Sequence, residues 1–154
     1  MNFRTRGFTL IEILVVLAIL AILFAIVLVA INPPRQISQA NDVKRKDDLN
    51  VILNSLYQYS IDHSGFPSGI ATTIKVIGTS GSGCAAACGT LSPPDACIDL
   101  SSALAPIYVN SVPFDPKTGS NTNTRYGVWK SETYNRITIK ACDAENESVI
   151  EVSR

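Results

Sequence analysis

An acidic side chain interrupts an otherwise apolar stretch near the start of this sequence. Phe8 to Ile31 comprises 24 residues, of which only Thr9 and Glu12 are not apolar. An ionised carboxylate in a lipid bilayer costs several kcal/mol unless it is paired, so such residues are candidates for function. The sequence therefore predicts that Glu12 takes part in charge pairing with a cation at the same depth.

The residues around Glu12 form a motif. A short basic leader, Gly7-Phe8-Thr9-Leu10-Ile11-Glu12 and a long apolar segment resemble the class III signal of type IV pilins and type II secretion pseudopilins. The resemblance implies that a membrane-embedded prepilin peptidase cuts after Gly7 and N-methylates Phe8. It also implies that Glu12, the fifth residue of the mature chain, is needed for assembly into a filament.

The physical chemistry of Glu12 agrees with this implication. Cleavage after Gly7 would leave an α-amine on Phe8 that is protonated near neutral pH. When subunits shift along a common axis, the carboxylate of one meets the amine of its neighbour, and this pairing favours docking in register. The alternative is a Glu12 that reaches the headgroups or is protonated.

The apolar stretch is long enough to cross a membrane. At ~1.5 Å per residue it forms a helix of roughly 36 Å, against a hydrocarbon core of ~30 Å. Arg4 and Arg6, with no acidic residue before the stretch, place the N-terminus in the cytoplasm and the rest outside. An ordinary secretory signal peptide would have an apolar core of about 7–15 residues, and Leu28-Val29-Ala30 is a poor cleavage site for one.

Helical spacing continues beyond the apolar stretch. Asn32-Pro33-Pro34 predicts a kink or break in one long helical element. From Gln36 to about Ser64, apolar residues recur at spacings of three and four, and Gly65 followed by Phe66-Pro67 ends the helix. The run from Lys46 to Pro67 resembles the second half of the pilin spine, and its single histidine, His63, fits a capping or solvated role.

The C-terminal part predicts a small antiparallel sheet. Candidate strands are Tyr126–Lys130, 136–142 and 148–152, after a loop at 68–96 and a short helix from Asp99 towards Ile107. The expected class is α+β: a long N-terminal helix, transmembrane in its first half, packed on this sheet, as in pilins. The expected organisation is a leader at 1–7, a transmembrane and filament-core helix at 8–31, an extramembrane helix at 32–66 and a globular region at 67–154.

Four cysteines lie on the predicted outer side: Cys84, Cys88, Cys97 and Cys142. An even number in an oxidising compartment predicts two disulfides, for which three connectivities exist. The sequence does not choose among them. We favour a small Cys84–Cys88 loop and a long Cys97–Cys142 staple. A zinc site is the alternative, but no CxxC pair is present and the histidine is distant.

A Pro-x-Asp-Pro segment at 113–116, followed by a polar loop and Tyr126, resembles the loop in which major pseudopilins bind calcium. Asp115, Asn121 and Asn123 are the candidate oxygen ligands. Only one of them is acidic, and the loop is longer than the family pattern. The alternative is an Asx-type turn packed under the sheet.

Charge and motif content restrict the function further. The net charge is zero, and without the two leader arginines 11 basic residues face 13 acidic ones, which argues against nucleic-acid binding. No nucleophile–base constellation is visible, so we do not expect an enzyme. The expected partners are identical or related pilin subunits, the prepilin peptidase, an inner-membrane assembly platform and the bilayer. The alternative is a single-pass, membrane-anchored binding module that is neither processed nor polymerised.

Overall fold

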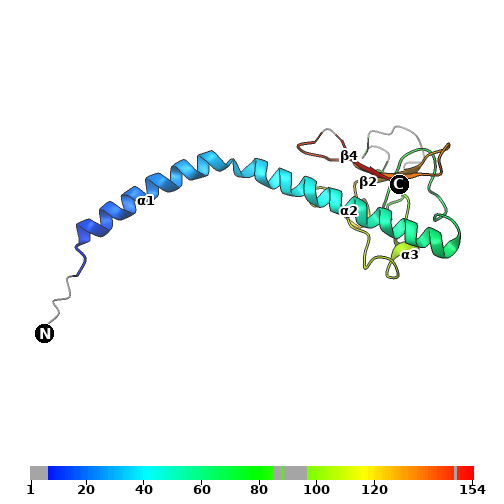
Figure 1. Ribbon diagram of the computed structural model, residues 1–154, viewed down its shortest axis with the longest axis horizontal. Coiled ribbons are helices and arrows are strands. Elements are labelled where there is room, and N and C mark those ends of the chain that lie inside the picture. Colours follow the sequence, from blue (N-terminus) through cyan, green and yellow to red (C-terminus); the bar gives the residue numbers. More distant parts are fainter. Residues whose placement is uncertain (1–6, 85–87, 89–96, 148) are drawn as a thin grey trace. The chain divides into compact units, whose positions relative to one another are not determined.

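The computed structural model describes residues 7–84, 88, 97–147 and 149–154. Along these described residues the elements are α1 (Leu10–Ile31), α2 (Pro33–His63), β1 (Lys75–Val76), α3 (Ser101–Leu104), β2 (Tyr126–Lys130), β3 (Ile137–Ala141) and β4 (Ile150–Ser153) (Figure 1). The chain forms two compact units, Met1–Ile37 and Ser38–Arg154. Of the predicted leader at residues 1–7, residues 1–6 lie outside the described residues and Gly7 lies within them.

Asn32 separates the two long helices. It adopts a left-handed conformation with φ 47° and ψ 71°. A residue before proline is disfavoured in the right-handed helical region, and asparagine tolerates the left-handed one. Pro33 and Pro34 fall in the first turn of α2, where a missing N–H leaves no hydrogen bond unmade, and the Asn32 carbonyl accepts from Arg35 N at 3.1 Å. The predicted break in the helical element is confirmed.

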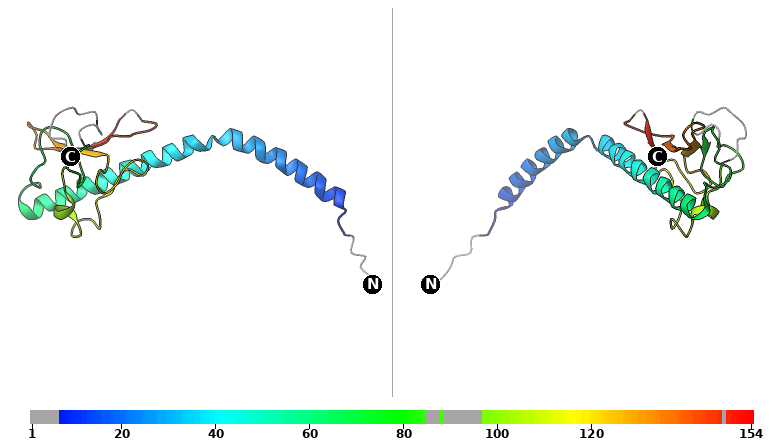
Figure 2. Two further views of the ribbon diagram at one scale, coloured as in Figure 1. Left: turned by 180° about the vertical axis from the view of Figure 1, so that it is seen from behind. Right: turned by 45° about the vertical axis from the view of Figure 1, so that its right-hand side comes forward.

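The hydrophobic core lies between α2 and the sheet, and the views in Figure 2 show α2 running alongside the strands. The sheet is antiparallel throughout, in the order β1-β2-β3-β4. Alternation along β3 directs Ile137, Ile139 and Ala141 to the core, where they join Leu49, Ile52 and Leu56 of α2. The α+β class and the three predicted strands are confirmed.

The smaller elements differ in detail from the sequence-based expectation. Ser64 takes a left-handed conformation at the end of α2, and Gly65 N donates to Ser60 O at 3.1 Å. Asp99 does not occupy the N-cap of α3, which is Leu100; its carboxylate accepts from Ser101 N at 2.8 Å instead. This helix also ends at Leu104, before Pro106, rather than reaching Ile107. β1 was not predicted.

Candidate functional site

The first turn of α1 holds the candidate assembly residue. Thr9 is an extended N-cap with φ −82° and ψ 152°. Its Oγ1 accepts from Glu12 N at 3.3 Å, and Thr9 N donates to Glu12 Oε2 at 3.5 Å. This reciprocal pair is a capping box, which supplies acceptors for two N–H groups that the helix leaves free. Glu12 also lies where the positive end of the helix dipole favours an anion.

The candidate cleavage position lies outside the helix. Gly7 and Phe8 have no regular secondary structure, because the Thr9 cap starts the helix at Leu10. Phe8 is 79% exposed. A Cβ added to Gly7 would meet no atom within 4 Å, so the fold does not require glycine at this position. A requirement for glycine at Gly7 would therefore reflect recognition by another protein.

The remainder of α1 is apolar on every side. None of the 22 residues of the whole helix is buried, although most are large aliphatic residues. Among the described residues, it is the one helix that is long and apolar enough to cross a membrane. A helix that is hydrophobic all round needs lipid or other helices around it.

Comparison with known proteins identifies a motif at the N-terminus. Residues 2–28 match a family model described as the prokaryotic N-terminal methylation motif. This chain carries that methylation motif. The methylation motif covers Gly7, Phe8 and Glu12, as the resemblance to type IV pilins and pseudopilins implied. No curated protein and no solved structure gives a significant match to the chain.

Beyond the methylation motif, the structure describes the predicted calcium loop. The Asp115 side chain is fully buried, and both of its oxygens bond to Arg45, through Nε at 2.6 Å and Nη2 at 3.2 Å. Asp115 Oδ1 also accepts from Lys117 N at 2.9 Å, Thr118 N at 3.0 Å and Thr118 Oγ1 at 3.1 Å. Burial raises the pKa of the Asp115 carboxyl, but these donors together lower it below its ordinary value.

The other two candidate ligands, Asn121 and Asn123, lie away from Asp115 in their contacts: Asn123 forms hydrogen bonds elsewhere, and Asn121 lines a cavity. Asn123 Oδ1 accepts from Arg125 N at 3.2 Å, and its Nδ2 donates to Gly83 O at 3.4 Å. Asn121 lines a cavity of about 270 Å³ beside Ile77. In the part of the chain that the structure describes, no three His, Cys, Asp or Glu side chains form a group suited to a metal. The residues present do not fit a calcium ion, because both carboxylate oxygens of Asp115 already accept hydrogen bonds from Arg45.

Arg45 is the central residue that sequence reasoning missed. Its side chain is 0% exposed and, besides Asp115, it contacts Asp42 Oδ1 at 2.7 Å and Glu145 Oε2 at 3.2 Å. In the sequence it lies in the charged run Lys44–Asp48, where nothing marks one charge as buried. Helical phase was the available signal, because Arg45 precedes Leu49 and Ile52 by four and seven residues and shares their face.

Asp42 joins this cluster to the β3–β4 loop. Its carboxylate accepts from Glu145 N at 3.0 Å and Asn146 N at 2.7 Å. Burial raises the pKa of Asp42, but these two N–H groups and Arg45 outweigh it and lower the pKa to about 2. The pKa of Glu145 falls to about 2 as well, chiefly because Lys117 and Asn41 donate to its carboxylate. The cluster thus ties α2 to two loops.

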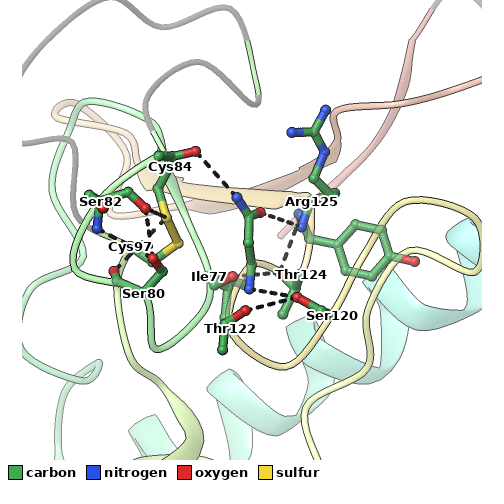
Figure 3. Close-up of a disulfide and its surroundings, with 12 residues drawn as sticks. Ile77, Ser80, Ser82, Cys84, Cys97, Ser120, Thr122, Thr124 and Arg125 are labelled. Carbon is green, nitrogen blue, oxygen red and sulfur yellow. Dashed lines mark hydrogen bonds between the residues drawn. A yellow bond between two sulfur atoms is a disulfide. The ribbon is translucent and has the colours of Figure 1, made fainter.

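The structure contains two disulfides, as predicted, but they join Cys84 to Cys97 and Cys88 to Cys142. The favoured pairing of Cys84 with Cys88 and Cys97 with Cys142 was therefore wrong. Backbone pairing explains the first: Ile98 N donates to Val76 O and Cys97 N to Ser80 O, which brings Cys97 against the 80–84 segment. Figure 3 shows this disulfide with Ser80 and Ser82 around it.

The second disulfide lies on the outer face of the sheet. Cys142 N donates to Arg125 O at 3.0 Å at the start of β2, and Cys88 Sγ lies 3.0 Å from the Cβ position of Gly127. Both disulfides pack with Val76 in a second, small core. Among the described residues no cysteine is free, so the zinc alternative has no thiolate ligand.

His63 is the last residue of α2. Its ring stacks on Tyr59 with centroids 4.1 Å apart, and Nδ1 lies 3.2 Å from the Tyr59 carbonyl in the last turn of α2. A histidine at a helix C-terminus interacts favourably with the carbonyl groups there.

Proposed function

We propose that this chain is a structural, non-enzymatic subunit of an extracytoplasmic filament of the type IV pilus or type II secretion pseudopilus kind. The observation that carries the proposal is the methylation motif at residues 2–28, which overlaps α1, a helix that is apolar apart from Glu12. The α+β architecture of the remaining chain supports it.

Processing turns an anchored precursor into a subunit. The prepilin peptidase cuts between Gly7 and Phe8 and methylates the new amine. The peptide bond to be cut precedes the Thr9 cap, and the neighbouring Phe8 is exposed, so a peptidase reaches it without unwinding α1. Residues 8–31 hold the precursor in the inner membrane, and residues 32–66 and 67–154 lie outside, where an oxidising compartment allows both disulfides to form.

Assembly exchanges lipid for neighbouring helices. An assembly platform moves subunits out of the bilayer, and the α1 helices of identical or related subunits then cover one another. A repeated, non-closing contact of this kind gives a helical filament. Glu12 leaves its own capping box and pairs with the Phe8 amine of a neighbour, which sets the register.

The N-terminus of the protein taken from its native membrane tests processing. Edman sequencing and intact mass should give a chain that starts at methylated Phe8. Gly7→Ala should fold normally, because the Cβ has open space, and should stay uncut. A mature chain that starts at Met1 or after Ala30 would contradict the proposal and favour an unprocessed, membrane-anchored binding module.

Two substitutions at Glu12 separate charge pairing from helix capping. Glutamine at this position can still form the capping box, whereas alanine cannot. We expect both Glu12→Gln and Glu12→Ala to insert and be processed, and both to be missing from sheared filaments. Normal filaments from Glu12→Gln would show that the charge is not what sets the register.

A further inference from the structure

The buried cluster around Arg45 combines three carboxylates with one guanidinium. Asp42 comes from α2, Asp115 from the loop before β2 and Glu145 from the β3–β4 loop. Their side chains are 5%, 0% and 16% exposed, and that of Arg45 is 0% exposed. Carboxylates brought together out of water repel one another and lose hydration, so the arrangement requires a cation.

Two kinds of cation balance carboxylate clusters in proteins. A calcium ion would take six to eight oxygen ligands. A guanidinium offers five N–H donors in a rigid planar fork, which suits several carboxylates at once. Here Arg45 makes four of these bonds: two to Asp115 and one each to Asp42 and Glu145.

Asp115 accepts further hydrogen bonds within its own loop. Lys117 N, Thr118 N and Thr118 Oγ1 all donate to Asp115 Oδ1. A metal ion in this position would have to displace both Arg45 and the donors that shape the loop. Lys117 also donates to Glu145, so a second positive charge serves the third carboxylate.

We propose that the Arg45 guanidinium is a built-in substitute for a divalent cation in the 113–124 loop, so that this domain folds independently of calcium. The positive charge arrives with α2 itself. The loop becomes ordered when the helix packs, whatever the ionic composition of the medium.

The first test compares unfolding with and without calcium. The full chain in detergent is unfolded with urea and followed by the fluorescence of Trp129, the single tryptophan, which lies in β2. We expect the same midpoint in millimolar CaCl2 and in EGTA. If calcium bound only the folded state and were present at a hundred times its Kd, it would raise the folding equilibrium constant about a hundredfold. A shift of that kind would overturn the proposal.

The second test is a double-mutant cycle between Arg45 and Asp115. Arg45→Gln should lower the folding constant by about a hundredfold or more, because it leaves buried carboxylates without their cation. Arg45→Gln combined with Asp115→Asn should lose at least about threefold less than the product of the single losses. If the loss in the double mutant equals the product of the two single-mutant losses, Arg45 acts by packing alone. That result would overturn the proposal.

Two further variants keep the cycle interpretable. If Arg45→Gln does not fold, Arg45→Lys takes its place, since it keeps the charge and loses the fork. The matched control is Arg125→Gln, which breaks an ion pair to a single, partly exposed carboxylate, Asp143, at 2.7 Å. Its loss should be about tenfold or less. A control loss as large as that of Arg45→Gln would remove the special role of the three-carboxylate cluster.

Discussion

The pH dependence of stability at Asp42 follows from its contacts. The pKa of this carboxyl is about 2 in the folded protein, against an ordinary value of 3.8. A lowered folded-state pKa contributes stability above the unfolded value, and this contribution is lost as pH falls through the folded value. The shift corresponds to about 2 kcal/mol at neutral pH, roughly half of that near pH 3 and little near pH 2.

Asp42→Asn measures this contribution in isolation. The variant should unfold more easily than the wild type at neutral pH, since asparagine brings no charge to Arg45 and the N–H groups of Glu145 and Asn146. The difference should shrink by about 2 kcal/mol between about pH 6 and pH 2. Acidic groups that share no contact with Asp42 contribute equally to both proteins, so taking the difference removes their contribution. Asp115 and Glu145 share Arg45 with Asp42, so their coupling to Asp42 stays within the measured difference.

Urea unfolding across this pH range, followed by Trp129 fluorescence, provides the measurement. Asp47→Asn, at an exposed position of the same helix, controls for the substitution itself. A difference between wild type and Asp42→Asn that stays constant from pH 6 to pH 2 would refute the reasoning, because the carboxylate would then contribute nothing through its charge.

Two further predictions concern the globular unit. The Cys88–Cys142 disulfide closes a longer loop than Cys84–Cys97, with sequence separations of 54 and 13, so chain entropy predicts losses of about 4 and about 3 kcal/mol when each pair is replaced by serine. Urea midpoints of the two double-serine variants would check this, and an equal or reversed order would contradict it. Gly119→Ala should cost about 1–3 kcal/mol, because its Cβ would lie 2.5 Å from Asp115 N, whereas Gly81→Ala, with open space, should stay within about 0.5 kcal/mol by the same assay. A harmless Gly119→Ala would show that the loop yields easily.

Periodic elements were predictable from the sequence. The spacing of Leu49, Ile52 and Leu56 and the alternation in β3 each reflect one face buried against one partner. The apolar run reflects a helix that is hydrophobic all round. In each case the local pattern carries the information. β1 has only two residues, Lys75–Val76, and no pattern can arise over that length. Its position depends on pairing with Gly127 and Val128, which lie far along the chain.

The interior contacts were less predictable, for a related reason. Arg45 and Lys46 are neighbours in one charged run, yet the first is fully buried and the second exposed, because they point to different sides of α2. Which charge is buried depends on where Asp115 and Glu145 arrive, and that is a property of the tertiary fold. The prediction of the disulfide pairing was wrong for the same reason, since backbone pairing with the 76–80 segment determines the position of Cys97.

The capping box at Thr9 and Glu12 bears on how firmly subunits hold together. In the proposed filament, Glu12 exchanges its hydrogen bonds with Thr9 in its own helix for a contact with the Phe8 amine of a neighbouring subunit. The net free energy is then the difference between two satisfied states, which is much smaller than that of rescuing a bare charge. A subunit that leaves the filament regains its former partner at once. A contact of this kind would favour reversible association, because release leaves no bare carboxylate behind.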